Sequence, residues 1–344
     1  MPEPPDAAID SKHDDLAAVK RLGEAHRKLK QEIARVVVGQ EQVLDSLMIG
    51  LLCRGHVLLH GVPGLGKTLM ARTLARTLHL DFKRIQFTPD LMPSDITGTD
   101  VIEEDGSAGR FSVKFMPGPL FTNFLLADEV NRTPPKTQAA LLQAMQEQEV
   151  SVGRTTYPLN PPFFVVATQN PIEMEGTYPL PEAQLDRFMF SVSVKYPNLN
   201  EEVAIVQGTT NLSVPTPEPV LSIEELLQLQ ELVRGVPISA DVVRYAARLV
   251  IATRPREGPE IAGVHRYISY GASPRASQYL VLGAKARALL AGRYHVDFSD
   301  IQAMAANVLR HRLVLNFHAR AEQISPEMLI TRLLDLIPTE EGRN

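Results

Sequence analysis

Gly61-Val62-Pro63-Gly64-Leu65-Gly66-Lys67-Thr68 is a complete match to the pattern GxxxxGK[ST], in which x is any residue. The apolar run 57–59 precedes this stretch, and the helix-like segment 67–79 follows it. Strand, glycine-rich loop and helix in this order form the setting in which the pattern binds the phosphates of a nucleotide. The sequence therefore predicts a nucleotide site here, against the alternative of a glycine-rich turn that binds nothing.

The residue types of this loop suit phosphate binding. Glycine permits the tight turns that point successive backbone N–H groups inward, and the N-terminus of the following helix adds partial positive charge. We expect Lys67 to reach the β- and γ-phosphates and the Thr68 hydroxyl to bind Mg²⁺. The nucleotide-binding residues predicted in this stretch are Gly61, Pro63, Gly64, Leu65, Gly66, Lys67, Thr68 and Leu69.

Composition indicates a globular chain without a membrane span. Hydrophobic residues make up 44% and charged residues 22% of the 344 residues, and no apolar run approaches the ~18 residues that a membrane span needs. The first ten residues, MPEPPDAAID, lack the basic and apolar regions of a signal peptide, so we expect a cytoplasmic protein. A net charge of −5 and the absence of tryptophan give no reason to expect nucleic acid as a partner. The single cysteine, Cys53, lies in an apolar stretch and is interpreted as a core residue.

Strand and helix patterns alternate through the first part of the chain. We predict a disordered tail over 1–13, then a nucleotide-binding α/β core over 14–200. Its first helices are expected at 14–37 and, after Val38-Gly39-Gln40, up to residue 52. Five apolar segments fit buried strands of a parallel sheet with the glycine-rich loop at its carboxyl edge: 56–60, 82–87, 123–127, 163–168 and 188–194.

Two intervals in this core fit inserted β-hairpins rather than core strands. They cover 98–119 and 149–159, each with a turn-rich centre between alternating segments. Between them we expect a helix with Thr133 as N-cap and Pro134 as its first residue. The hairpin residues Phe111, Phe115, Met116 and Tyr157 fit either contact with a client protein or packing of the hairpins themselves.

Composition changes after the last strand. A proline-rich linker is expected over 201–220, around one helix, and a helical lid domain over 221–344. Several of the lid helices open on serine, a preferred N-cap residue. The segments with helical periodicity are 222–234, 239–254, 273–291, 299–317 and 325–336.

Two strand ends carry the remaining chemistry. Asp128 and Glu129 follow the apolar run 124–127, where Asp128 would bind Mg²⁺, mostly through water, and Glu129 would orient the attacking water. Taken alone, such an acidic pair also fits the favourable charge at a helix N-terminus. Asn170 follows the next strand and would bind a phosphate oxygen and the lytic water, although an Asn before a proline is also a common turn residue.

The motifs GVPGLGKT, FLLADEVNRTPPKTQAALLQAMQE, ATQNP, LPEAQLDRF and GASPRA follow one another in this chain, and together they resemble the MoxR family of AAA+ ATPases. The resemblance covers about residues 29–335. It implies an α/β P-loop NTPase fold of three layers, with a five-stranded parallel sheet of order 5-1-4-3-2 and a C-terminal all-helical lid. It further implies a homo-oligomeric ring, usually a hexamer, with ATP and Mg²⁺ bound between subunits.

The resemblance also implies roles for single residues. Arg187 would be a finger offered to the ATP of a neighbouring copy and Arg275 a second sensor from the lid, while Val38 and Gly39 would border the adenine. The Walker A motif would include Lys67 and Thr68, Walker B would be Asp128 and Glu129, and Asn170 would be the first sensor.

The chemistry of arginine supports the roles of Arg187 and Arg275 independently of the resemblance. A guanidinium suits a phosphate with developing charge, although Arg187 also fits an ordinary ion pair with Glu182 or Asp186. Arg275 stands in the first turn of a predicted helix, where the dipole disfavours a cation, so we expect an anionic group nearby. Arg132 fits a nucleotide sensor, a partner of Glu129 or a partner of a neighbour.

Three functions are compatible with these features. The favoured one is an ATP-hydrolysing ring that remodels or activates a client, which the resemblance implies to be a protein with a von Willebrand A domain. The second is a nucleotide-gated scaffold with incidental turnover, and the weakest is a DNA-directed AAA+ protein. Nine histidines without a ligand spacing such as HExxH give no reason to expect a metal other than Mg²⁺.

Overall fold

A five-stranded parallel sheet forms the centre of the structure, a computed structural model that describes residues 21–105, 110–170, 176–210, 215–257, 261 and 263–339. Its strands run in the order β2-β5-β8-β1-β9, which confirms the expected order 5-1-4-3-2. The strands β1, β5, β8 and β9 are almost entirely buried, since helices cover both faces of the sheet. The five strands are β1 (Val57–His60), β2 (Phe82–Gln86), β5 (Phe124–Asp128), β8 (Phe164–Gln169) and β9 (Phe190–Ser193).

Each face of the sheet belongs to a different hydrophobic cluster. On one face the strands pack with a helix over 21–34, with α2 (Glu41–Leu52), with α3 (Lys67–Thr77) and with the lid. On the other face they pack with α4 (Pro93–Thr97), α5 (Pro135–Glu147) and the base of the second hairpin. The predicted three-layer architecture is therefore confirmed, and the expected tail over 1–13 lies outside the described residues.

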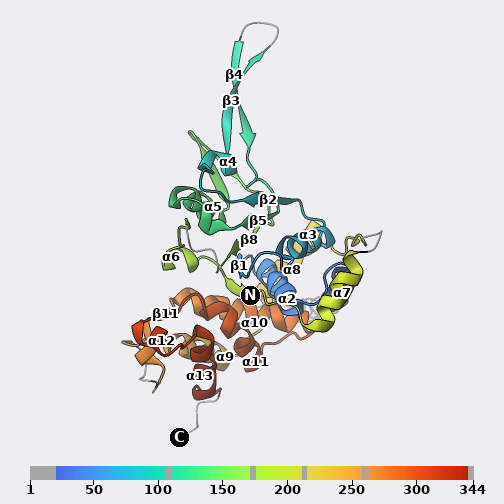
Figure 1. Cartoon of the computed structure of the whole chain (residues 1–344). Coiled ribbons are helices and arrows are strands. Elements are labelled where there is room, and N and C mark those ends of the chain that lie inside the picture. Colours follow the sequence, from blue (N-terminus) through green and yellow to red (C-terminus); the bar gives the residue numbers. More distant parts are fainter. Residues whose placement is uncertain are drawn as a thin grey trace, which may run out of the picture.

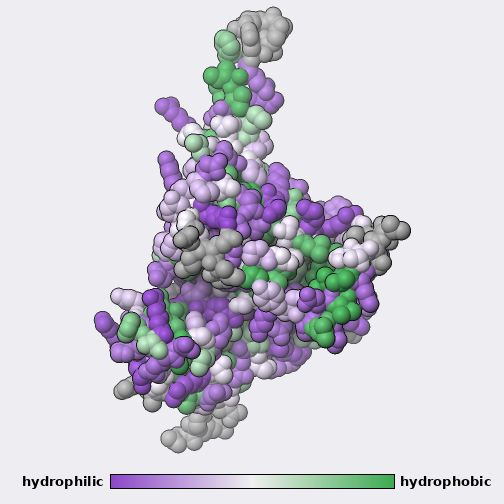
Figure 2. Space-filling view, in the orientation of Figure 1, coloured by the Kyte–Doolittle hydropathy of each residue, from purple (hydrophilic) through white to green (hydrophobic). Residues whose placement is uncertain are grey.

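Both predicted hairpins are present on the second face. The first consists of β3 (Gly98–Asp105) and β4 (Arg110–Pro117) and projects from the body, at the top of Figure 1. The second consists of β6 (Glu149–Val152) and β7 (Thr155–Pro158). The rings of Phe115 and Tyr157 stack at 4.1 Å and join the two hairpins, whereas Phe111 and Met116 are exposed. Figure 2 shows apolar surface along the projecting hairpin and over α7 (Leu199–Thr209).

The helix between the hairpins starts later than predicted. Pro134 is the N-cap of α5, with ψ near 155°, and Pro135 is the first helical residue. Thr133 is therefore not the N-cap; its hydroxyl points to the carbonyl of Leu91 at 3.4 Å. Val130–Arg132 form a short 3-10 turn before it.

The C-terminal region is helical, with one small exception. Its helices are α8 (Ile223–Gly235), α9 (Ala240–Ile251), α10 (Pro274–Leu290), α11 (Phe298–Leu309), α12 (Phe317–Ala321) and α13 (Pro326–Leu336). The exception is an antiparallel pair, β10 (Ile268–Tyr270) and β11 (Val314–Leu315), so the lid is not entirely helical. The helix predicted over 299–317 ends at Leu309, because the residues after it turn into the core and bind backbone carbonyls there.

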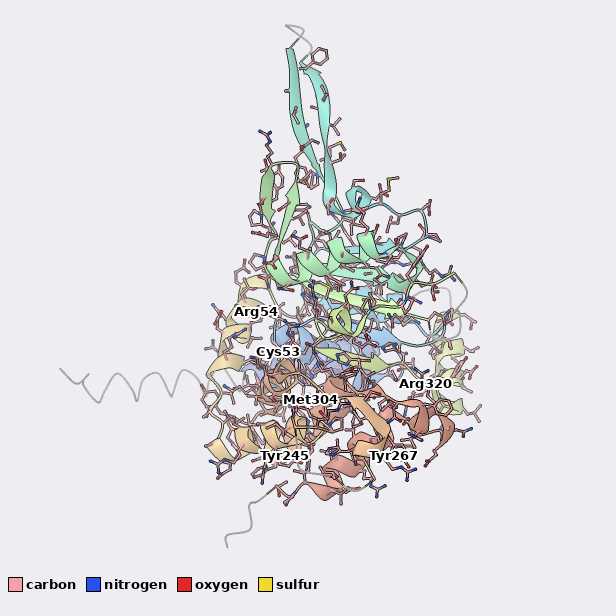
Figure 3. All side chains as sticks on the ribbon, turned by 90° about the vertical axis from the view of Figure 1, so that its left-hand side faces the viewer. Cys53, Arg54, Tyr245, Tyr267, Met304 and Arg320 are labelled. Carbon is pink, nitrogen blue, oxygen red and sulfur yellow. The ribbon has the colours of Figure 1, made fainter. Side chains whose placement is uncertain are left out.

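The lid is packed closely onto the core. Cys53 is buried and its thiol donates to the carbonyl of Leu282 in α10, which confirms that it is a core residue. Arg54 donates to Gln230 and pairs with Glu231 of α8. In Figure 3 Cys53 and Arg54 lie above Met304 and Tyr245 of the lid. Among the described residues, no helix has both the length and the apolar character needed to cross a bilayer.

Candidate nucleotide-binding site

A cleft of about 440 Å³ opens at the carboxyl edge of the sheet, beside the N-terminus of α3. Parallel strands end at one edge, so side chains from β2, β5 and β8 meet the glycine-rich loop there. The cleft is lined by Pro63, Gly64, Leu65, Gly66, Lys67, Thr68, Leu69, Arg84, Gln86, Asp128, Glu129, Thr168 and Asn170. Most of the predicted site residues are therefore brought together.

The loop has a backbone that requires glycine. Gly64 and Gly66 have φ of 85° and 73°, a region that other residues enter at a cost of about 1–2 kcal/mol. Gly66 is the N-cap of α3, and neither a capping side chain nor an acidic residue occupies the first turn. The N–H groups at this helix end are thus left to face an anion, where the helix dipole favours negative charge.

Backbone carbonyls of the glycine-rich loop hold the side chain of Lys67 over that loop. Its Nζ donates to the carbonyls of Gly61 and Val62 at 2.5 and 2.9 Å. Gly61 itself does not line the cleft; it contributes this carbonyl. Burial lowers the pKa of Lys67, and the carboxylates of Asp128 and Glu129 act in the opposite direction. The two acids therefore help to keep the ammonium charged within reach of the cleft.

Asp128 is buried at the end of β5 and makes two polar contacts with other strands. Its Oδ1 accepts from the hydroxyl of Thr168 in β8 at 2.6 Å. Its Oδ2 accepts from Nε and Nη2 of Arg84 in β2, at 3.1 and 2.7 Å. The predicted Mg²⁺ ligand thus has a cation as its neighbour, and the contact of Asp128 with Arg84 would compete with metal binding.

Glu129 adopts a left-handed backbone, with φ of 57° and ψ of 48°. Its N–H donates to Thr168 Oγ1 at 2.9 Å, which ties the residue to β8. Its Oε2 accepts from Gln86 Nε2 at 2.7 Å and from Arg132 Nε at 3.0 Å. Arg132 therefore pairs with Glu129, which was one of the alternatives for this arginine, and the carboxylate is held from both sides.

Thr168, Arg84 and Gln86 were missed from the sequence. Gln86 and Arg84 also bind each other, since Arg84 Nη2 donates to Gln86 Oε1 at 2.7 Å. On β2 the buried Ile85 separates them, so both point to the cleft side of the sheet. This alternation was the available signal: β2 pairs with β5, the strand that ends in Asp128, so polar residues on one side of β2 face the same ligands as Asp128.

The predicted adenine-side residues Val38 and Gly39 lie beside the start of α7. A Cβ at Gly39 would stand 2.6 Å from Glu201 Oε1, and Gln40 donates to the carbonyl of Lys195 at 2.8 Å. Val194, the residue before Lys195, packs against Gly61. Residues 194–195 therefore connect the segment 38–40 to the glycine-rich loop, although neither Val38 nor Gly39 lines the cleft itself.

Arg187 and Arg275 lie outside the cleft. Arg187 Nη1 donates to the carbonyl of Leu142 in α5 at 3.1 Å. Arg275 Nη1 lies 3.5 Å from Asp186 Oδ2, so Asp186 is the anionic group expected near this arginine. No residue among those that line the cleft comes from the lid.

The donor set fits a magnesium nucleotide. The Thr68 hydroxyl and the Asp128 carboxylate are oxygen ligands of the kind that Mg²⁺ prefers, and they line the same cleft as the N-terminus of α3. Among the residues that the structure describes, no three or more His, Cys, Asp or Glu side chains form a group that could hold a metal ion.

Comparison with known proteins agrees with this geometry. Residues 56–190 match the ATPase family associated with various cellular activities (AAA), and residues 260–333 match the AAA lid domain. The chain is 46% identical over 306 residues to Chaperone MoxR1 of Mycobacterium tuberculosis, covering 89% of this chain and 80% of the relative. It is 35% identical to Protein MoxR of Paracoccus denitrificans, with 86% and 90% covered.

A solved structure gives the same result. A protein from Cytophaga hutchinsonii with a provisional description as an ATPase superposes with a TM-score of 0.87 at 42% identity, over 97% of this chain and 99% of the other. The parallel sheet, the glycine-rich loop and the lid thus define an AAA+ ATPase. Within that class, the chain belongs to the MoxR family.

Proposed function

We propose that this chain is a Mg²⁺-dependent ATPase that works as a homo-oligomeric ring, with six copies as the expected number, and remodels or activates a client protein. The observation that carries the proposal is the single cleft that gathers Lys67, Asp128, Glu129 and Asn170 at the N-terminus of α3. A cation, two carboxylates and an amide are the groups that phosphoryl transfer to water requires.

Each residue has one task in this proposal. Lys67 binds the β- and γ-phosphates, and Thr68 and Asp128 hold Mg²⁺, which spreads the negative charge of the phosphates. Glu129 polarises the attacking water, and Asn170 donates its amide to that water or to a phosphate oxygen. The hydrogen bonds that fix the side chain and the backbone of Glu129 support this role, because a base acts only from a defined position.

Arg187 completes the site of the next copy in this proposal. Its place outside its own cleft supports a role at the site of a neighbouring copy. Arg275 is proposed to report the nucleotide from the lid. A trans arginine accelerates related hydrolases by about 10³ to 10⁵, so a copy on its own should turn over ATP slowly.

The first test separates binding from turnover. Lys67→Ala should abolish ATP binding, whereas Glu129→Gln should bind ATP, lose turnover and accumulate as a ring. Glu147→Gln, the same chemical change on the exposed end of α5, is the control and should keep parental activity. If Glu129→Gln hydrolyses ATP at the parental rate, the assignment of the catalytic carboxylate is wrong.

The second test identifies the client. A pull-down with Glu129→Gln, locked with ATP, should retain a protein with a von Willebrand A domain, and Lys67→Ala should not. The nucleotide-gated scaffold would be supported instead if the parental protein with ATP retains the client as well as Glu129→Gln does, and if ATP turnover does not change the activity of the client. Capture of nucleic acid would support a DNA-directed protein, against which the net charge of −5 counts.

A further inference from the structure

A buried arginine of the lid binds the segment that carries Arg187. Arg312 follows α11, and only 1% of its side chain is exposed. Its Nε donates to Asp186 Oδ1 at 2.7 Å, and its Nη2 donates to the carbonyls of Asp186 and Phe188 at 2.9 and 2.7 Å. The guanidinium therefore holds the backbone on both sides of Arg187.

The contacts around Arg312 leave the segment little freedom. Its Nη1 donates to the carbonyl of Met189 at 3.3 Å, and its guanidinium lies 5.2 Å from the ring centre of Tyr279 in α10. The preceding Arg310 donates to the carbonyl of Ser191 at 2.8 Å. Carbonyls in β9 and in the residues just before it are thus bound by side chains of the lid, which makes separation of the lid from this segment costly.

Asp186 is the point where this contact meets Arg275. Its carboxylate binds Arg312, lies 3.5 Å from Arg275, and accepts from the hydroxyl of Ser273 at 3.1 and 3.2 Å. Arg275 and Ser273 stand at the start of α10. The carboxylate that precedes Arg187 is therefore shared by two arginines of the lid.

We infer that Arg312 and Asp186 are positioning residues, which set Arg187 for the ATP of the neighbouring copy and link it to the lid of their own copy. This inference rests on the proposed function, since it takes Arg187 to act in trans. With the carbonyls of residues 186 and 188 fixed, the backbone of Arg187 follows any shift of the lid helices. A displacement of about 1 Å at a catalytic group can cost about a hundredfold in rate.

The test uses Asp186→Asn, which keeps the shape of the side chain and removes its charge. In a pure assembly this variant should lower kcat between about tenfold and a hundredfold, while a fluorescent ATP analogue binds within about twofold of the parental affinity. Mixing it with Lys67→Ala protein, which has an intact Arg187 but cannot bind ATP, should restore activity. Arg312→Lys should behave in the same way, because the single nitrogen of lysine does not reproduce the planar fork in which Nε binds the carboxylate and Nη2 the two carbonyls.

Two controls separate the possible failures. Glu231→Gln neutralises another carboxylate at the border of core and lid, where it pairs with Arg54, and should keep parental kcat. Arg187→Ala should also be rescued by Lys67→Ala. If Arg187→Ala is rescued and Asp186→Asn is not, or if Asp186→Asn keeps parental kcat, the positioning role is wrong. If Arg187→Ala is not rescued, the trans finger of the proposed function fails.

Discussion

The hydroxyl of Thr168 offers the sharpest test of how Glu129, the proposed catalytic carboxylate, is positioned. It is buried, donates to Asp128 Oδ1 at 2.6 Å and accepts from the N–H of Glu129 at 2.9 Å. Thr168→Val keeps the shape and removes both hydrogen bonds. Since the left-handed backbone of Glu129 costs about 1–3 kcal/mol, loss of the contact that holds it should let the residue relax.

The size of the effect follows from these two bonds. A buried N–H left without a partner costs about 1–3 kcal/mol, and a hydrogen bond to a charged group contributes about 1.5–3 kcal/mol. We expect Thr168→Val to lower the free energy of unfolding by about 2.5–6 kcal/mol, the sum of those ranges. The shift of Glu129 should lower kcat by about a hundredfold, because orientation of the attacking water is lost.

The assay compares Thr168→Val with Thr168→Ser. Serine keeps the hydroxyl and loses a methyl group, so it should cost no more than about 1.5 kcal/mol and keep kcat within a few fold. Steady-state ATP hydrolysis gives kcat and KM, and thermal unfolding gives stability. Parental kcat in Thr168→Val would refute the role of Thr168, whatever the change in stability.

Three further predictions follow from the same contacts. Arg84→Ala should lower the Mg²⁺ concentration for half-maximal hydrolysis by up to about fivefold, because a half-exposed ion pair of about 0–1 kcal/mol no longer competes for Asp128; an unchanged Mg²⁺ titration would contradict this. Gly66→Ala should weaken binding of an ATP analogue and lower the melting temperature, since φ of 73° costs alanine about 1–2 kcal/mol; parental affinity would contradict it. Burial lowers the pKa of His56 and His60 from 6.5 to about 4. Between these two pH values the unfolded state binds more protons than the folded state, so the free energy of unfolding decreases as the pH falls through this window. The decrease is about 1.4 kcal/mol per pH unit for each histidine. Urea unfolding at pH 7, 6 and 5 measures the slope, which should decrease in His60→Asn.

Local patterns in the sequence were sufficient for most of the fold. Apolar runs gave all five strands to within two residues at each end, because parallel strands buried on both faces leave a strong signal. Serine N-caps marked the starts of α8, α9 and α13, where the hydroxyl accepts from the third helical residue. The sheet order came from the resemblance, since strand periodicity says nothing about which strands are neighbours.

Contacts between distant residues were beyond the sequence patterns. Arg312 and Asp186 are 126 positions apart, and Arg84 and Asp128 are 44 apart, so neither pairing leaves a local signature. The same reason explains the end of α11. Helical periodicity continues to residue 317, but the carbonyls of Phe188 and Ser191 bind residues 310–312 and end the helix at Leu309.

The two hydrophobic clusters constrain how nucleotide chemistry can move this molecule. The lid shares one cluster with α2 and α3, so lifting it away from the core would expose a continuous buried surface; sliding of packed helices is the motion that such an interface permits. Arg312 lies on this interface and would carry such a shift to Arg187. The residue after Glu129, Val130, belongs to the other cluster, together with Val150 and Leu159 at the base of the second hairpin. A change at Glu129 would therefore reach the hairpins through the cluster that contains no lid residue, so the proposed contacts with a neighbouring copy and with a client would be reached by separate physical routes.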